Sequence, residues 1–368
     1  VDAVKYVNPD STSSCVVSVT NSGNKADSFD ITSVDFLSPA GGWTETHTSS
    51  VGPLNPSVAG QATVQVYAPG NATYPTSMQL RINVQSQSNV SVKRNTTFTA
   101  VINKVNSTYV SADPFINTSD PGGTAKFVLT VKNTGNGLSS IDLTLPQFPS
   151  DMTPSLDRSA VDLAAGQSIT VNLTVLVGQN APKGDSNILV KATVHDTAAS
   201  SNYTVIVRVN QVYNLTVFSS GSYSLHLSPG AKVSYGITVK NTGNGNDTIT
   251  LTNGTAASGL TVFFDAQNID LGPGASRTLN ATVEVAKGTS SGSYQVELKG
   301  TSTGGKAAST TIIAIVDPFG VQLVASPSSG QVRPGESGKY TMIIKNTGAS
   351  KDSFFVNLSS NPFNWGSM

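Results

Sequence analysis

Apolar and polar residues alternate along many short segments of this chain. In one of them Val233, Tyr235, Ile237 and Val239 alternate with Lys232, Ser234, Thr238 and Lys240. A period of two is that of a β-strand with one buried face. No long segment has the period of 3.6 residues that a helix would show, and we expect at most one helical turn, over 155–165. The pattern therefore predicts an all-β protein.

The strands belong to a repeat that is marked by an asparagine. The phrase K-N-T-G-N-G occurs at 132–137 and 240–245, K-N-T-G-A at 345–349, and T-N-S-G-N at 20–24. Successive asparagines, from Asn21 through Asn133 and Asn241 to Asn346, are 112, 108 and 105 residues apart. A proline stands 12 residues before each of them: Pro9, Pro121, Pro229 and Pro334. Agreement at fixed offsets in four copies indicates tandem structural units.

Turn signals divide each repeat into strands. Pro-Gly precedes the alternating segment in repeats two to four, although the first repeat lacks it, and Asn and Gly in N-T-G-N-G tolerate positive φ. An L-x-x-G turn follows at Leu163–Gly166 and Leu271–Gly274. About seven short strands per repeat, with a turn every ~8–12 residues, are typical of an Ig-like sandwich. We therefore expect tandem Ig-like β-sandwich domains arranged end to end, and a structural role for the asparagine.

The spacing predicts four repeats: 1–103, 104–211, 212–316 and 317–368. By comparison with the inner repeats, the first lacks its first strand and the fourth lacks its last strands. Two explanations remain open. The sequence is a piece of a longer chain, or a neighbouring subunit supplies the missing strands as in donor-strand assembly.

Composition narrows the function classes. The 368 residues have zero net charge and only 12% are charged, which argues against a nucleic-acid binder and a polybasic membrane-surface protein. No apolar run is long enough to span a membrane. Ser and Thr together number 90, and Asn 29, and such a polar, uncharged surface favours an extracellular, cell-surface location.

Candidate catalytic residues are few. The single cysteine, Cys15, corresponds to Phe127, Tyr235 and Tyr340 of the later repeats, so we expect a buried thiol. The histidines (His47, His195 and His226) show no metal-ligand spacing. G-x-S-x-G occurs at 288–292 and 300–304, but neither copy has the strand–turn–helix context of a nucleophile elbow. We expect no enzyme activity and no cofactor.

Calcium is the one metal that the pattern keeps open. Asp27, Asp247 and Asp352 share one position after the asparagine, near loops rich in carbonyl groups, and oxygen ligands suit Ca²⁺. Ser139 occupies that position in the second repeat. Turn-capping aspartates are the favoured interpretation, with a structural Ca²⁺ as the alternative.

N-glycosylation is the modification that the sequence predicts. Asn172 and Asn280 share one repeat position and alternate with inward-facing residues, so both should face solvent. The twelve N-x-S/T sequons lie at Asn71, Asn89, Asn95, Asn106, Asn117, Asn172, Asn202, Asn214, Asn246, Asn253, Asn280 and Asn357.

The combination of Pro-Gly, an alternating strand, K-N-T-G-N-G and a later L-x-x-G-x-S resembles the tandem Ig-like (CARDB-like) repeats of archaeal cell-surface proteins, over nearly the whole chain. That resemblance implies surface layers, extracellular filaments or stalks. We therefore expect a self-assembling surface-layer glycoprotein whose partners are further copies and N-linked glycans. The alternatives are a filament subunit joined by strand donation, and an adhesin or stalk. An adhesin would need an exposed aromatic patch, for which Trp43 and the cluster Phe363, Asn364 and Trp365 are candidates.

Overall fold

The computed structural model describes residues 3–219 and 224–357, and these form strands, turns and loops with no helix. The segment predicted to hold a helical turn contains the end of one strand and a second short strand, so that prediction is wrong. The structure also confirms the all-β class. No helix able to cross a membrane occurs in the part of the chain that the structure describes.

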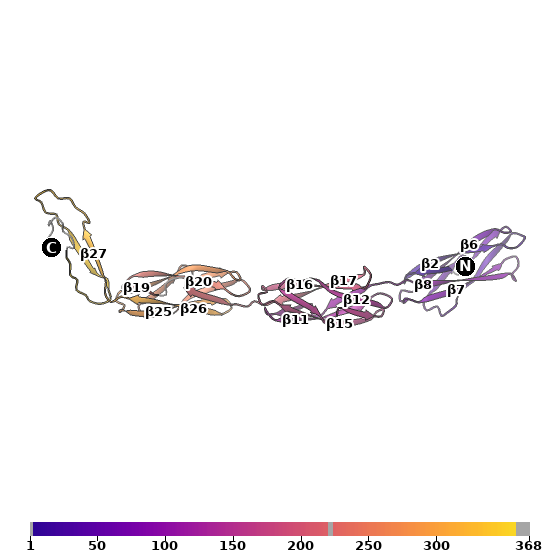
Figure 1. Ribbon diagram of the computed structural model, residues 1–368. Helices are drawn as coiled ribbons and strands as arrows, with labels where there is room; N and C mark the ends of the chain where they lie inside the picture. Colours follow the sequence, from indigo (N-terminus) through magenta and orange to yellow (C-terminus); the bar gives the residue numbers. More distant parts are fainter. Residues whose placement is uncertain (1–2, 220–223, 358–368) are drawn as a thin grey trace. The chain divides into compact units, whose positions relative to one another are not determined.

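The first repeat is a sandwich of two sheets (Figure 1). One sheet has the strand order β1-β8-β7-β3-β5, and the other has β2-β6-β4. The strands are β1 (Ala3–Val7), β2 (Ser11–Thr20), β3 (Asp27–Phe36), β4 (Thr44–His47), β5 (Ser50–Leu54), β6 (Ala59–Ala68), β7 (Ser77–Ser86) and β8 (Lys93–Ile102).

The second repeat has sheets β10-β17-β16-β12-β14 and β13-β15-β11-β9. The strands are β9 (Thr108–Ala112), β10 (Ile116–Ser119), β11 (Thr124–Asn133), β12 (Ser139–Gln147), β13 (Met152–Leu156), β14 (Ala160–Leu163), β15 (Ser168–Val177), β16 (Gly184–Val194) and β17 (Ser200–Val209).

The third repeat has the same order, in sheets β19-β26-β25-β21-β23 and β18-β20-β24-β22. The strands are β18 (Leu215–Ser219), β19 (Ser224–Leu227), β20 (Lys232–Asn241), β21 (Asp247–Ala256), β22 (Leu260–Phe264), β23 (Asn268–Leu271), β24 (Ser276–Val285), β25 (Gly292–Ser302) and β26 (Ala307–Val316).

Within the described residues each inner repeat thus has nine strands, where the sequence predicted about seven. The chain enters a repeat on one sheet and then changes to the other: β9 pairs antiparallel with β11, and β10 pairs parallel with β17. The third repeat pairs β18 with β20 and β19 with β26 in the same way. A second reason for the higher number of strands is a pair of short strands, of five and four residues, such as β13 and β14. Strands this short carry too little alternation to be recognised in a sequence.

Alternating side chains of the two sheets meet in a core in each sandwich. In β11 every second residue from Ala125 to Asn133 is buried, and the residues between them are exposed. Cores in which Val, Ile, Leu and Ala predominate fill the first and third sandwiches. Two packed sheets of this kind, mostly antiparallel and repeated along the chain, define tandem Ig-like sandwiches.

The described part of the fourth repeat is a hairpin of β27 (Val321–Ser326) and β28 (Thr341–Asn346). Both strands are exposed along their whole length. Tyr340, which the repeat alignment predicts to point into a core, is 46% exposed, because the structure describes no second sheet over this hairpin.

The chain divides into two compact units. One comprises 1–179 and 185–209, and the other comprises 180–184 and 210–368. The predicted repeat boundaries at 103, 211 and 316 stay a prediction.

Candidate functional site

The recurrent asparagine begins a turn that the first three repeats build in the same way. We call residues 21–25, 133–137, 241–245 and 346–350 the asparagine turns. The side chain of Asn133 donates from Nδ2 to the carbonyl oxygens of Gly137 and Leu163, at 2.7 and 2.8 Å, and its Oδ1 accepts from Gly135 N at 2.9 Å. Asn241 and Asn21 make the corresponding three bonds. A buried amide whose donors and acceptor are all paired is a structural cross-tie.

The main chain of the same asparagine binds the L-x-x-G turn. Asn133 N donates to Gln167 O, and its carbonyl oxygen accepts from Gly166 N. Gly166 has a φ of 77° and its counterpart Gly274 has a φ of 75°. The first repeat places Ser57 at this position, with a φ of 68°. Because the turn needs a left-handed residue, Ser57 carries a backbone strain that glycine avoids.

In the Pro-Gly turn, too, the first repeat has another residue at the position of the left-handed glycine. Gly122, Gly230 and Gly335 have φ values of 77°, 83° and 83°. The first repeat has Asp10 there, with a φ of 54°, and Asp10 Oδ1 accepts a hydrogen bond of 2.6 Å from the Tyr67 hydroxyl. The turn therefore forms in the first repeat without the Pro-Gly signal that the later repeats carry.

The glycine in the middle of each inner asparagine turn lies under the incoming linker. A Cβ on Gly135 would stand 2.3 Å from Val105 O, and one on Gly243 would stand 2.4 Å from Val212 O. A Cβ on Gly23 of the first repeat would meet only the Asn21 side chain, at 3.1 Å. The glycine is thus required where a linker crosses the turn, a reason that the sequence alone did not supply.

The three aspartates of the calcium hypothesis cap turns. Asp27 Oδ1 accepts from Ser28 N and Ser88 N, and Oδ2 accepts from the Ser86 hydroxyl at 2.5 Å. These bonds, that from Ser86 first, hold the pKa of Asp27 below its ordinary value. Asp352 accepts from Ser353 N.

Asp247 differs, because only Oδ1 has a partner, Thr303 N, while Oδ2 is buried without one among the described residues. Asp247 lines an open pocket of about 370 Å³ together with Asp270 and Asn246. Within the described residues no three His, Cys, Asp or Glu side chains gather as metal ligands. Ca²⁺ stays an alternative, and Asp247 is its best position.

Cys15 lies in β2 and is buried, as predicted. Burial raises the pKa of its thiol, so the neutral form dominates at neutral pH. Its counterparts Phe127 and Tyr235 are buried at 1% and 3% exposure.

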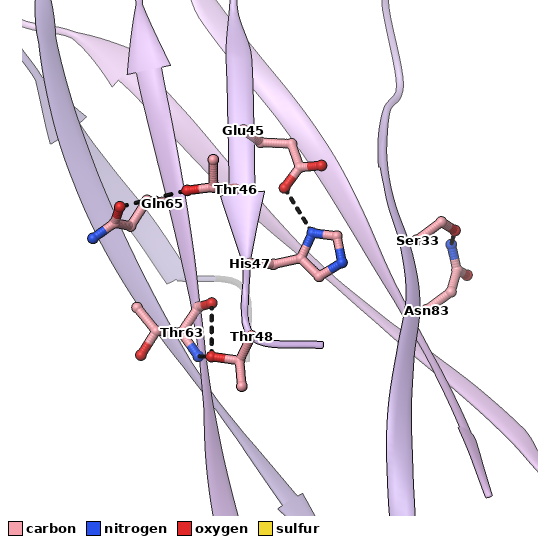
Figure 2. A network of polar contacts seen from close by, with 8 residues as sticks. All are labelled: Ser33, Glu45, Thr46, His47, Thr48, Thr63, Gln65 and Asn83. Atoms are coloured by element: carbon pink, nitrogen blue, oxygen red, sulfur yellow. Dashed lines mark hydrogen bonds and ion pairs between the residues drawn. The ribbon is translucent and has the colours of Figure 1, made fainter. Parts of the chain in front are cut away.

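The histidines belong to three different sandwiches, and each pairs with a carboxylate. His47 Nδ1 lies 2.9 Å from Glu45 Oε2 on the surface of the β4–β6 sheet (Figure 2). His195 Nδ1 lies 2.7 Å from Asp142 Oδ2, and His226 Nδ1 lies 2.6 Å from Asp317 Oδ1. The polar contacts in Figure 2 are separate pairs, such as Thr48 with Thr63, and they do not converge on a common point.

Neither G-x-S-x-G segment forms a nucleophile elbow. Ser290 lies in the loop after β24, and Ser302 is a buried residue at the end of β25 that accepts a hydrogen bond from Gly304 N. The strand–turn–helix geometry that would present a serine hydroxyl is missing at both places.

The sequons differ in how accessible the amide is. Asn172 and Asn280 are exposed, as predicted, and so are eight others: Asn71, Asn89, Asn95, Asn202, Asn214, Asn246, Asn253 and Asn357. Asn106 and Asn117 are half-buried, and Asn117 Nδ2 donates to Lys126 O at 2.9 Å. Asn106 Oδ1 is buried without a partner among the described residues. Glycosylation of the twelve stays a prediction.

The aromatic patch predicted for an adhesin is not formed by Trp43, which is 5% exposed and belongs to the core of the first sandwich. Apolar and polar residues do not alternate regularly around Gly41 and Gly42, so the sequence alone does not show which way the Trp43 side chain points. Phe363, Asn364 and Trp365 lie outside the described residues.

A groove of about 340 Å³ runs beside β2 in the first sandwich. Val17, Val19, Phe29 and Val84 line it, together with polar residues of β8. In the second and third repeats the corresponding side of β11 and β20 is covered by β9 and β18. Within the described residues, β2 has a neighbouring strand only in β6.

No family model matches the sequence, and no curated protein matches it. Among solved structures, the protocadherin GammaB4 extracellular domain matches with 10% identity over 94% of this chain and 54% of that chain, at a TM-score of 0.49. The protocadherin gammaB7 EC3-6 cis-dimer structure matches with 12% identity over 94% of this chain and 83% of that chain, at a TM-score of 0.43. A protein of unknown function from Porphyromonas gingivalis W83 matches with 21% identity over 56% of this chain and 99% of that chain, at a TM-score of 0.24. These are likenesses of fold alone, and the chain spans about half the length of the GammaB4 structure.

Proposed function

We propose that this chain is a structural, self-assembling cell-surface glycoprotein, a component of a surface layer, and not an enzyme. The observation that carries the proposal is the asparagine turn. The asparagine side chain that begins this turn occurs in all four repeats, and its hydrogen bonds go to main-chain atoms of the same repeat. A catalytic residue is needed once, whereas a shape-determining residue is needed in every unit.

The distribution of sequons supports an extracellular location. Ten of the twelve acceptor side chains are exposed. Glycans at these positions would cover strands whose outer faces are polar but uncharged, and would hinder sheet-to-sheet association. The low charge of the chain also leaves it without a basic face for nucleic acid.

Electron microscopy of native, unsolubilised cell-surface material that carries this chain tests the proposal. A two-dimensional lattice is the expected result, and a regular fibre would show a filament subunit instead. Isolated molecules without order would overturn self-assembly and favour the adhesin or stalk.

The groove beside β2 favours strand donation as the second candidate. It has the position that β9 and β18 fill in the inner repeats, and those strands place Val110 and Val217 against the core. A labelled peptide with the sequence of residues 213–219 should bind the full chain, and Val17→Arg should abolish binding. Cross-linking of native material would then identify whether the natural strand comes from a neighbouring copy or from the same polypeptide. Failure of the peptide to bind would remove the groove as a strand acceptor.

A further inference from the structure

The second asparagine of N-T-G-N-G makes a set of contacts different from those of the first. Asn136 Oδ1 accepts from Val105 N at 2.8 Å, and Nδ2 donates to Asn103 O at 2.8 Å. Both partners belong to the linker that enters the second repeat. The main-chain N of Asn136 donates to Val105 O as well.

The same residue also holds a loop of the first repeat. Asn136 Nδ2 donates to Ala72 O at 3.5 Å, and its carbonyl oxygen accepts from Tyr74 N at 2.8 Å. Ala72 and Tyr74 lie in the loop between β6 and β7. One residue thus binds the linker and the preceding repeat's loop together.

The second unit contains the same arrangement. Asn244 accepts from Val212 N at 2.8 Å and donates to Asn210 O at 2.9 Å. It also donates to Ala181 O at 3.1 Å, and its carbonyl oxygen accepts from Lys183 N at 3.0 Å. The loop 180–184, between β15 and β16, belongs to this unit. The main-chain N of Asn244 donates to Val212 O as well, so all five contacts of Asn136 recur at Asn244.

The fourth repeat lacks both the acceptor and the donor of the hydrogen bond between the second asparagine and the linker. Ala349 replaces the second asparagine, and Pro318 replaces Val105 and Val212, so the linker N–H is lost together with the side chain that would accept it. Ala349 N donates to Asp317 O and Ser350 N to Pro318 O, which retains main-chain contacts to the linker. Among the described residues, no hydrogen bond joins the loop 286–291 to this turn.

We propose that the residue after N-T-G is the determinant of repeat docking: asparagine at 136 and 244 is a positioning residue that ties the linker and the preceding loop to the turn, and the Ala349–Pro318 pair marks a junction without this tie. The recognition is of main-chain atoms, so the partner surface is any loop that presents a carbonyl and an N–H two residues apart. The inference goes beyond the proposed function, since an adhesin or a stalk would need the same junctions.

Hydrogen exchange of the full chain, read by mass spectrometry in overlapping peptides, tests it through Asn136→Ala. The Tyr74 amide bonds to the main-chain oxygen of residue 136, which the substitution leaves in place. Faster exchange in peptides spanning 70–76, by about fivefold to tenfold, would therefore report undocking of the loop and not loss of its acceptor. Peptides of β11 should be unchanged, which would exclude unfolding of the second sandwich.

Asn24→Ala is the matched control, because Asn24 is the exposed counterpart in the first repeat, where Gly23 has no linker above it. It should leave exchange unchanged. In the unsubstituted chain, the loop 286–291 should exchange faster than the loop 70–76. Unchanged exchange at 70–76 in Asn136→Ala, or equal exchange of the two loops in the unsubstituted chain, would overturn the proposal, whatever assembly microscopy shows.

Discussion

At the scale of single residues, the fold depends on a polar side chain in an apolar core. Asn133 and Asn241 are fully buried, and each joins two turns that are about thirty residues apart in the chain. An aliphatic residue of the same volume would fill the space but would remove two donors to carbonyl oxygens and one acceptor of an N–H. Of the two N–H groups, Gly135 N keeps a second acceptor in Ser107 O.

Asn241→Ala should therefore destabilise the third sandwich by about 2–4 kcal/mol, since three hydrogen bonds of about 1 kcal/mol each are lost and buried groups are left unpaired. The measurement is urea denaturation of the full chain, where one transition should move to lower urea. Thr242→Ala, at the exposed neighbouring position, should change the free energy of unfolding by less than about 0.5 kcal/mol. Equal effects of the two substitutions would contradict the role given to Asn241.

Ser57→Gly should stabilise the first sandwich by about 0.5–1 kcal/mol, because it relieves a left-handed φ in a residue with a Cβ. Gly274→Ala is the reciprocal change in the third sandwich, where a Cβ would meet no atom within 4 Å and only the conformation is penalised. It should destabilise by a similar amount. Thermal denaturation of each variant shows whether its stability rises or falls. A fall in the stability of Ser57→Gly would show that the strain at Ser57 is relieved elsewhere.

At the scale of elements, the linkers and hairpins depend on close main-chain contacts. Gly135→Ala should destabilise the second repeat by about 1–3 kcal/mol, because its Cβ would overlap with Val105 O. Gly23→Ala, at the same turn position without a linker, should cost clearly less. Calorimetry of the two variants is the measurement, and comparable losses would mean that the linker is not what requires glycine.

The hairpin between β16 and β17 should respond to pH through His195. The hydrogen bond that His195 donates to Asp142, then the charges of Asp196 and Asp142, raise the pKa of His195 above its ordinary value of 6.5. A raised pKa in the folded state contributes stability that is present below pH 6.5 and is lost as pH rises through the folded-state pKa. His195→Asn should therefore remove a small fall in the urea midpoint between mildly acidic and alkaline pH. NMR titration of His195 gives its pKa directly, and a value at or below 6.5 would contradict this expectation.

How much the sequence predicts also differs between elements. The ten-residue strands follow from alternation, which depends on residues close together in the chain, and the asparagine turns follow from a phrase that recurs in every repeat. The parallel pairing of β10 with β17 does not, since those strands are separated by eighty residues or more and nothing local records the partner. The sequence does not predict the positive φ of Ser57 and Asp10, because positive φ is expected only at glycine and asparagine. Comparison with Gly166 and Gly122 at the same repeat offsets is the signal that could have found them.

At the scale of the whole molecule, glycans should be distributed according to amide exposure. The exposed Asn172 and Asn280 should carry glycans, whereas the half-buried Asn117 and Asn106 should be largely unmodified. Glycopeptide mass spectrometry of material from the native source measures the occupancy of each site. Full occupancy at Asn117 would show that modification precedes folding of this strand, and absence of glycan at all twelve sites would remove the glycoprotein assignment.

The contacts of Asn136 and Asn244 with the loops 72–74 and 181–183 have an evolutionary consequence. Because these hydrogen bonds are made to backbone atoms of the preceding loop, they do not depend on which side chains that loop carries. Duplication, deletion or exchange of a whole repeat within the gene therefore leaves the tie available at each new junction where the following repeat carries the second asparagine. A protein built in this way can change its length by recombination alone, without a matching point mutation at the joint.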